Sequence, residues 1–149
     1  MEIDAAASAL DASSSAPAHA PFRVVICDDV AVLRALVRAE IEEDPLLRVV
    51  GEAGDGRSAV LEVERARPDV VLLDLSMPDL DGLEAIPRMR ELSPQSGIVV
   101  FSGFAAGRMS AAALEAGADH YLEKGEPGSV IVRALKHVAS LRPRGPVTG

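Results

Sequence analysis

The stretch PDVVLLDLSMPDLDGLEAI, residues Pro68–Ile86, changes character at one carboxylate, Asp74. Directly before it, Val70–Leu73 form a continuous apolar run, which is typical of a parallel strand covered on both faces of its sheet. Beyond a short segment that contains proline and glycine, apolar residues recur at helical spacing over Leu83–Leu92. The stretch therefore predicts a buried strand that ends on Asp74 and leads through a turn into a helix.

Four similar runs lie on either side of this stretch, and helical patterns fill the gaps between the runs. The runs are RVVIC from Arg23, RVVGEA from Arg48, GIVVFS from Gly97 and DHYLEK from Asp119. The other helical patterns cover Leu33–Ile41, Arg57–Ala66, Arg108–Ala116 and Ile131–Val138. Five strands that alternate with five helices predict an α/β fold, in which right-handed crossovers place helices on both faces of a parallel sheet.

Two residues bear on the limits of the predicted helices. Gly117 follows the fourth helical pattern and is well placed to end that helix, because glycine adopts the left-handed conformation of many helix C-termini. Pro87 falls inside the third pattern, where it removes a backbone hydrogen bond. We therefore expect the third helix to start late or to bend at Pro87.

The composition of the 149 residues suits one folded domain. The chain is 48% hydrophobic and only 3% aromatic, so aliphatic side chains must fill its core. Its net charge of -8 argues against direct binding to nucleic acid, which needs clustered Lys and Arg. No apolar run approaches the roughly 18 residues that span a membrane, and the start, MEIDAAASALDASSS, lacks the basic region of a signal peptide. A cytoplasmic location is expected, and the single cysteine, Cys27, is predicted to be a small core residue.

Both ends of the chain differ from its middle. Residues 1–21 are rich in Ala, Ser and Pro and are predicted to be a disordered tail. Within them Ile3, Ala7 and Leu10 have helical spacing, which leaves a short docking helix as an open alternative. Residues 142–149 are predicted to be a flexible C-terminal tail, so the folded domain is expected over residues 22–141.

Charged and hydroxyl side chains stand at four of the five predicted strand ends. Asp28 and Asp29 follow the first strand, Asp74 ends the third, Ser102 ends the fourth and Lys124 ends the fifth. In parallel sheets ligands bind beyond the carboxyl ends of the strands, so these groups should converge there. Three close carboxylates repel one another unless a cation lies among them, and Mg²⁺ prefers such oxygen ligands. A carboxylate can also attack a phosphoryl group, whose charge a lysine would help to neutralise.

Each of these residues also has an ordinary structural interpretation. Asp28 and Asp29 could cap the first helix, Lys124 could be a solvated edge lysine and Ser102 a loop hydroxyl. Those interpretations would require four unrelated coincidences at the same edge of one sheet. We therefore favour a single site.

Residues Phe22 to about Leu141 resemble a response-regulator receiver domain. The resemblance rests on VVICDD, PDVVLLDLSMPDLDGLEAI, VVFSG and GADHYLEK. It implies a flavodoxin-like (CheY-like), doubly wound, five-stranded parallel sheet of order 2-1-3-4-5 with five helices. The sequence looks closest to the NarL/FixJ (LuxR-type) subfamily, and it ends where that subfamily's helix-turn-helix domain would begin. A stand-alone response regulator is therefore expected.

The same resemblance implies roles for the residues at the strand ends. Asp74 would be the phosphorylated nucleophile. The resemblance assigns Mg²⁺ to Asp29 directly, to Asp28 through water, to Asp74 and to the backbone carbonyl of Ser76. Lys124 would pair with the phosphoryl oxygens.

The resemblance also implies which residues would transmit the signal and which would set the lifetime of the phosphorylated state. Ser102 would hydrogen-bond the phosphoryl group and move inward on activation, while the rotamer of Tyr121 follows it and Gly103 leaves access. Ser76 and Phe104 would flank the path of the attacking water. Because Ser76 is short and Phe104 is apolar, we expect slow loss of the phosphoryl group, unless Phe104 points outward to a docking surface. Gly125 stands where many receivers have proline, so the loop after Lys124 is expected to be more mobile.

The resemblance implies a phosphorylated switch rather than an enzyme with a substrate of its own. Its phosphodonor would be a sensor histidine kinase. Its output would pass to a downstream protein target, to a His-containing phosphocarrier or through a phosphorylation-dependent homodimer, without direct DNA binding or a membrane.

Three alternatives were weighed against this interpretation. A phosphatase of the haloacid dehalogenase type needs a second Asp where Ser76 stands. A flavodoxin-like cofactor site needs a phosphate-binding loop after the first strand, where Asp28 and Asp29 would repel phosphate. A phosphorylation-independent interaction module on the same scaffold stays open.

Overall fold

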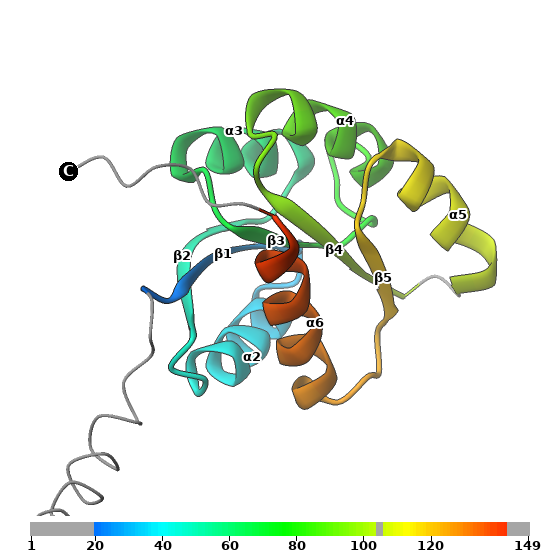
Figure 1. The fold of residues 1–149 in the computed structure, drawn as a ribbon. Helices are drawn as coiled ribbons and strands as arrows, with labels where there is room; N and C mark the ends of the chain where they lie inside the picture. Colours follow the sequence, from blue (N-terminus) through cyan, green and yellow to red (C-terminus); the bar gives the residue numbers. More distant parts are fainter. Residues whose placement is uncertain (1–19, 104–105, 143–149) are drawn as a thin grey trace, which may run out of the picture.

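The computed structural model describes residues 20–103 and 106–142, which form five strands and five helices labelled as in Figure 1. The strands are β1 (Phe22–Cys27), β2 (Leu47–Ala53), β3 (Val70–Leu73), β4 (Gly97–Ser102) and β5 (His120–Glu123). The helices are α2 (Ala31–Glu42), α3 (Gly56–Ala66), α4 (Gly82–Leu92), α5 (Ala106–Ala116) and α6 (Gly128–Leu141).

All four strand pairs in the sheet are parallel, and the strand order is β2-β1-β3-β4-β5. The predicted fold class and strand order are therefore confirmed. β3 lies at the centre, where its four residues are all buried, as its continuous apolar run predicts. A register shift between Val24 and Val25 is the one irregularity in the pairing of β1 with β2.

The sheet separates two hydrophobic cores (Figure 1). Successive strand residues point to opposite faces, so Val25 and Cys27 of β1 join the core under α3, α4 and α5. Val24 and Ile26 join the core under α2 and α6. Cys27 is buried, as predicted, and burial raises the pKa of its thiol.

Side-chain caps explain where two of the helices begin. The Asp55 carboxylate accepts a hydrogen bond of 2.8 Å from the Ser58 N–H at the start of α3. The Asp81 carboxylate accepts one of 2.8 Å from the Leu83 N–H at the start of α4. Such caps satisfy backbone donors that have no partner within the helix.

Of the two outcomes expected for the third helix, the late start is wrong, because α4 begins at Gly82 and contains Pro87, while the bend at Pro87 stays a prediction. The Asp81 cap fixes the earlier start. Pro87 is exposed, so its ring lies on the outer surface of α4. At the end of α5, Gly117 has φ +125 and confirms the predicted helix stop.

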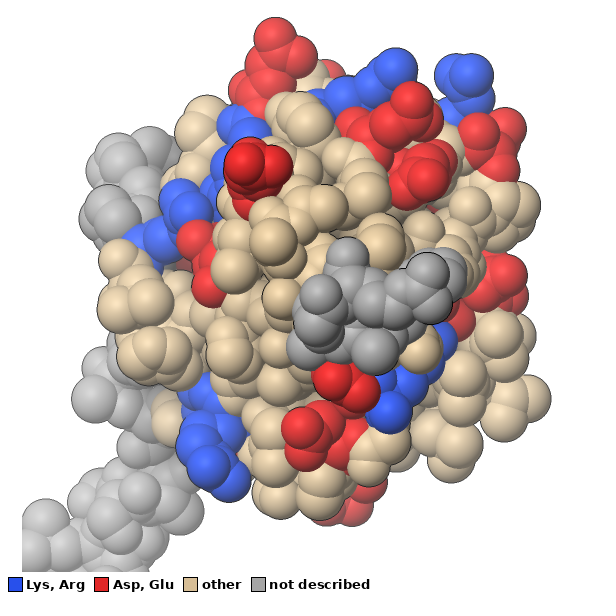
Figure 2. Space-filling model, turned by 90° about the vertical axis from the view of Figure 1, so that its right-hand side faces the viewer, with Lys and Arg blue, Asp and Glu red and all other residues tan. Residues whose placement is uncertain are grey.

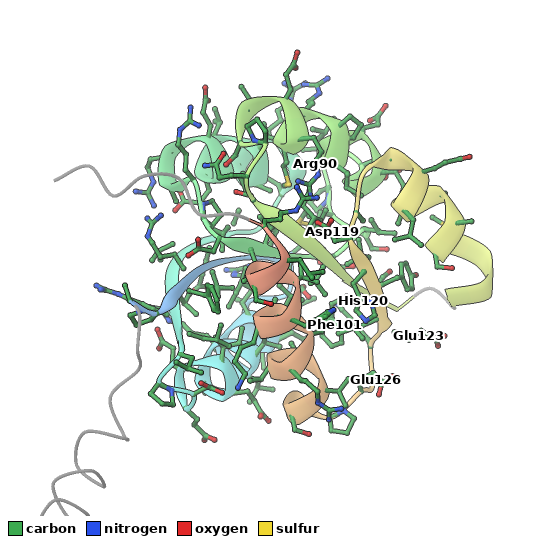
Figure 3. All side chains as sticks on the ribbon, viewed as in Figure 1. Arg90, Phe101, Asp119, His120, Glu123 and Glu126 are labelled. Carbon is green, nitrogen blue, oxygen red and sulfur yellow. The ribbon has the colours of Figure 1, made fainter. Side chains whose placement is uncertain are left out.

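An ion-pair cluster fastens the edge of the sheet where the strands begin (Figure 3). The Asp119 carboxylate pairs with Arg90 of α4 and with Arg142 after α6, each at 2.6 Å. Arg90 also donates to the carbonyls of Ser96 and Gly117. These contacts join the loops that lead into β4 and β5, at the end of the sheet opposite to Asp74.

No helix in residues 20–103 and 106–142 has both the length and the apolar character that crossing a membrane requires.

One exposed residue, Arg67, occupies the left-handed backbone region after α3, with φ 44. A side chain is disfavoured there, whereas glycine is not. We expect Arg67→Gly to increase the free energy of unfolding by about 0.5–1 kcal/mol in urea denaturation. The matched control is Arg65→Gly within α3, which should lower it by about 1 kcal/mol. Equal destabilisation by both changes would show that the backbone at residue 67 is unstrained.

Candidate functional site

Four groups come together beyond the carboxyl ends of the strands. Asp28 directly follows β1, Asp74 follows β3 and Lys124 follows β5, while Ser102 is the last residue of β4. Backbone hydrogen bonds fix two of these positions: the Asp74 N–H donates to the Cys27 carbonyl at 2.9 Å, and the Lys124 N–H to the Ser102 carbonyl at 2.7 Å. The sheet ladder itself thus brings these residues together.

Lys124 bridges two buried carboxylates. Its Nζ lies 2.8 Å from Asp28 Oδ2 and 3.0 Å from Asp74 Oδ2. Asp28 and Asp74 are only 6% and 4% exposed. The ammonium therefore compensates two charges that would otherwise repel each other across the site.

The second oxygen of each carboxylate is held by a backbone N–H. Asp28 Oδ1 accepts from Val30 at 2.8 Å, and Asp74 Oδ1 accepts from Ser76 at 3.0 Å. Each carboxylate thus has both of its oxygens hydrogen-bonded, one to backbone and one to Lys124. This arrangement fixes the orientation of both side chains before any ligand binds.

The carboxylates also fit a magnesium ion. One oxygen from each of Asp28, Asp29 and Asp74 lies within 4.8 Å of the others. Oxygens on opposite sides of one Mg²⁺ are about 4 Å apart, since each Mg–O distance is about 2.0–2.1 Å. Asp29 is exposed, whereas the other two are buried. The donor set therefore suits a hard cation that keeps part of its water shell.

Burial is the main cause that raises the pKa of Asp74 above its ordinary value. The hydrogen bonds from Ser76 and Lys124 act in the opposite direction, and the nearby Asp28 charge adds to the rise. For Lys124, burial alone would lower the pKa, but hydrogen bonds to Asp28 and Asp74 outweigh it, so its pKa is raised. Lys124 therefore stays positively charged, whereas the charged form of the buried Asp74 carboxylate is disfavoured.

Residues 24–136 match the family model of the response regulator receiver domain. The chain belongs to this family.

The relatives of this receiver include a methylesterase/glutaminase and a nitrate/nitrite response regulator. The chain is 41% identical over 106 residues to a protein-glutamate methylesterase/protein-glutamine glutaminase of Rhodospirillum centenum, covering 70% of the chain and 27% of the relative. It is 38% identical over 120 residues to the nitrate/nitrite response regulator NarP of Escherichia coli, covering 80% of the chain and 56% of the relative. The receiver thus spans about a quarter of the first relative and just over half of the second.

Solved structures agree with this membership. The receiver domain of NarL from Mycobacterium tuberculosis superimposes with a TM-score of 0.79 at 31% identity, covering 83% of this chain and 100% of that one. The response regulator domain of CheB from Thermotoga maritima gives 0.76 at 25% identity, covering 83% and 99%.

Ser102 and Tyr121 lie on the same face of the receiver's sheet. Tyr121 is paired with Val100, two residues before Ser102 on β4, and residues two apart on a strand share a face. Ser102 is fully buried, and Tyr121 packs half-buried against the core beneath α5. A group that displaced the Ser102 side chain would therefore act on the side of the sheet that carries α5.

The loop after Asp74 is anchored by two glycines that the sequence did not single out as site residues. The Gly56 N–H donates to the Pro78 carbonyl at 3.1 Å, and the Gly82 N–H to the Leu75 carbonyl at 3.2 Å. A Cβ on either would lie 2.6 Å or less from backbone atoms of Leu80 or Leu75. These close approaches hold Ser76 beside Asp74, and no sequence pattern short of a known fold could have indicated Gly56.

The remaining predicted site residues are placed as follows. Ser76 is exposed next to Asp74, and Gly103 faces open space, with no atom within 4 Å of where its Cβ would lie. Phe104 lies outside the described residues, so its expected role stays a prediction.

Because burial raises its pKa, the Asp74 carboxylate should reduce stability at neutral pH. A raised pKa means that stability falls as pH rises from the unfolded pKa through the folded one. In metal-free buffer at pH 7 we expect Asp74→Asn to increase the free energy of unfolding, with the gain shrinking as the pH falls through the raised folded pKa and gone below the unfolded pKa of about 4, where the group is neutral in both states.

The matched control is Asp119→Asn, which weakens a carboxylate paired with two arginines. It should lower the free energy of unfolding by about 1–3 kcal/mol. Destabilisation by Asp74→Asn at pH 7 would contradict the argument.

Proposed function

We propose that this receiver accepts a phosphoryl group on Asp74 from a sensor histidine kinase, with Mg²⁺ held by Asp28, Asp29, Asp74 and the backbone carbonyl of Ser76. The contact of Lys124 with both buried carboxylates is the observation that supports the proposal most strongly. A structural aspartate would not need to be buried at a raised pKa beside a second carboxylate, whereas a preorganised nucleophile would.

The chemistry follows from the charges already present. An Asp74 oxygen attacks phosphorus, the bond from phosphorus to the donor imidazole nitrogen breaks, and that nitrogen keeps the electron pair. Lys124 then shifts from the carboxylate to a phosphoryl oxygen, which replaces one anionic partner by another. When bound, Mg²⁺ would neutralise charge on the transferring group. Asp74 is in this account a phosphoacceptor, not the centre of an enzyme that turns over a separate substrate.

Signal output would use the face formed by α5, β5 and α6. Part of this face is uncharged, with acidic and basic side chains around it (Figure 2). Between β5 and α6 it has a hollow of about 270 Å³, which His120, Val130, Arg133, Ala134 and His137 line. Ser102 and Tyr121 would couple this face to the phosphoryl group. The partner would be a downstream protein, a His-containing phosphocarrier or a second copy.

The first test is phosphorylation by acetyl phosphate, followed by intact mass measurement. With Mg²⁺ present we expect the mass of one phosphoryl group, and none after chelation by EDTA or in Asp74→Asn. Asp29→Ala should weaken Mg²⁺ binding more than Asp28→Ala, because Asp28 is already engaged by Lys124 and Val30.

Asp81→Asn is a suitable control, since Asp81 is an exposed helix cap in the same motif. It should be phosphorylated like the wild type. Undiminished phosphorylation of Asp74→Asn would refute the assignment, and full phosphorylation in EDTA would refute the metal site.

The output face can be tested by hydrogen exchange with and without beryllofluoride, a phosphoryl mimic. We expect altered exchange between about Ser102 and Lys136, in α5, β5 and the start of α6, because new charge at Asp74 acts first on Ser102 and Tyr121. α3 provides the internal control and should change little. If exchange changed only around β2 and α3, the output face would be assigned wrongly.

A further inference from the structure

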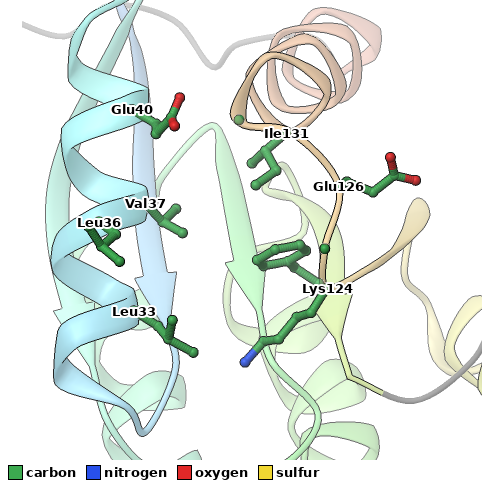
Figure 4. Close-up of a pocket in the computed structure, with 10 residues that line it drawn as sticks. Leu33, Leu36, Val37, Glu40, Lys124, Glu126 and Ile131 are labelled. Atoms are coloured by element: carbon green, nitrogen blue, oxygen red, sulfur yellow. The ribbon is translucent and has the colours of Figure 1, made fainter.

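An apolar groove of about 380 Å³ runs between α2 and α6 (Figure 4). Leu33, Leu36 and Val37 of α2 form one wall, and Phe101 and Ile131 contribute to the other. Leu36 is 59% exposed. Exposed aliphatic side chains beside an open groove are typical of a surface that receives a further chain segment.

The groove shares a wall with the phosphoacceptor site. Lys124 lines the groove at the end next to Leu33, and its Nζ also contacts Asp28 and Asp74 (Figure 4). The Lys124 ammonium lies 6.0 Å from the centre of the Phe101 ring within the same groove. An occupant of the groove would therefore touch the lysine that the phosphoryl group needs.

We propose that the occupant is the N-terminal segment of the same chain, residues 1–19. These residues lie outside the described part of the chain, and their sequence places Ile3, Ala7 and Leu10 at helical spacing. Three apolar side chains on one stripe are what a groove of this kind binds.

The point of attachment and the lengths agree with this occupant. The Phe22 N–H donates to the Leu46 carbonyl at 2.8 Å, so the chain enters β1 close to the end of α2. The groove from Leu33 to Glu40 follows α2 for about 10 Å, and a helix from Ile3 to Leu10 has the same length of about 10 Å at 1.5 Å per residue. Residues 11–19 can span up to about 30 Å between the two.

The point where the chain enters the fold favours one direction for the segment. The chain enters near Glu40, so Leu10 meets that end of the groove and Ile3 meets the end at Leu33 and Lys124. Glu2 and Asp4 flank Ile3 and would then lie beside the Lys124 ammonium. Asp11 next to Leu10 would lie near Glu40, and Glu126 also lines the groove, so the direction rests on the point of entry and not on charge.

Docking within one chain needs little intrinsic affinity, since a short tether gives an effective concentration of the order of millimolar. The consequence for signalling rests on the proposed function. With the segment in place, Glu2 and Asp4 would compete with Asp28 and Asp74 for Lys124. The segment would then slow phosphoryl transfer from a protein donor until it is displaced. The docking itself does not depend on phosphorylation.

The test is a spin label on the full-length chain. Ala5→Cys places the label opposite the stripe of Ile3, Ala7 and Leu10, while the native Cys27 is buried and its thiol pKa is raised, which protects it from labelling. We expect the label to broaden the methyl resonances of Leu33, Leu36, Val37 and Ile131 selectively. Val60 and Val63 of α3, which belong to the core on the other face of the sheet, should keep their intensity.

The matched variant carries Ile3→Asp and Leu10→Asp in the labelled chain, and it should lose the broadening. Both changes lie outside the described residues and leave every residue of the two hydrophobic cores unchanged. Absence of broadening at the groove, equal broadening in the variant, or broadening that arises only between mixed copies would each overturn the proposal. None of these results depends on phosphorylation of Asp74, so failure here is separate from failure of the proposed function.

Discussion

The ammonium of Lys124 lets two carboxylates stay buried at one end of the sheet. Asp28 and Asp74 come from neighbouring central strands, and their proximity would be costly without a cation between them. The parallel topology makes the cluster unavoidable, because every strand delivers its last residue to the same edge. The sheet, its loops and the site therefore depend on a positive charge between these two carboxylates, which Lys124 or a bound cation must supply.

The two edges of the sheet use charge differently. At the opposite edge, Asp119 is paired with two arginines, and the cluster fastens neighbouring loops. At the carboxyl edge, one lysine serves two buried aspartates, and burial raises the pKa of Asp74. This imbalance favours added positive charge, which a metal ion would supply, and under the proposed function it favours transfer of the Asp74 charge to a phosphoryl group. Functional sites commonly reduce the stability of the fold in this way.

Much of this arrangement could be predicted from the sequence. The continuous apolar run before Asp74 identified the central strand, and the residues at the other strand ends identified the edge where the site lies. The sequence could not tell which of Asp28 and Asp29 turns inward, because that depends on the residue at which β1 ends. It also could not indicate Gly56, whose role arises from contact with Leu80 across the fold. Pro87 does not delay the start of α4, which begins at Gly82 directly after the Asp81 cap.

The central claim is that Asp74 itself carries the phosphoryl group. Borohydride reduces an acyl phosphate, so a phosphorylated aspartate becomes homoserine and can be located by peptide mass spectrometry. After treatment with acetyl phosphate and Mg²⁺, the account predicts homoserine at position 74 and unchanged aspartate at positions 28 and 29. Homoserine at either of those two positions, or at none, would contradict it.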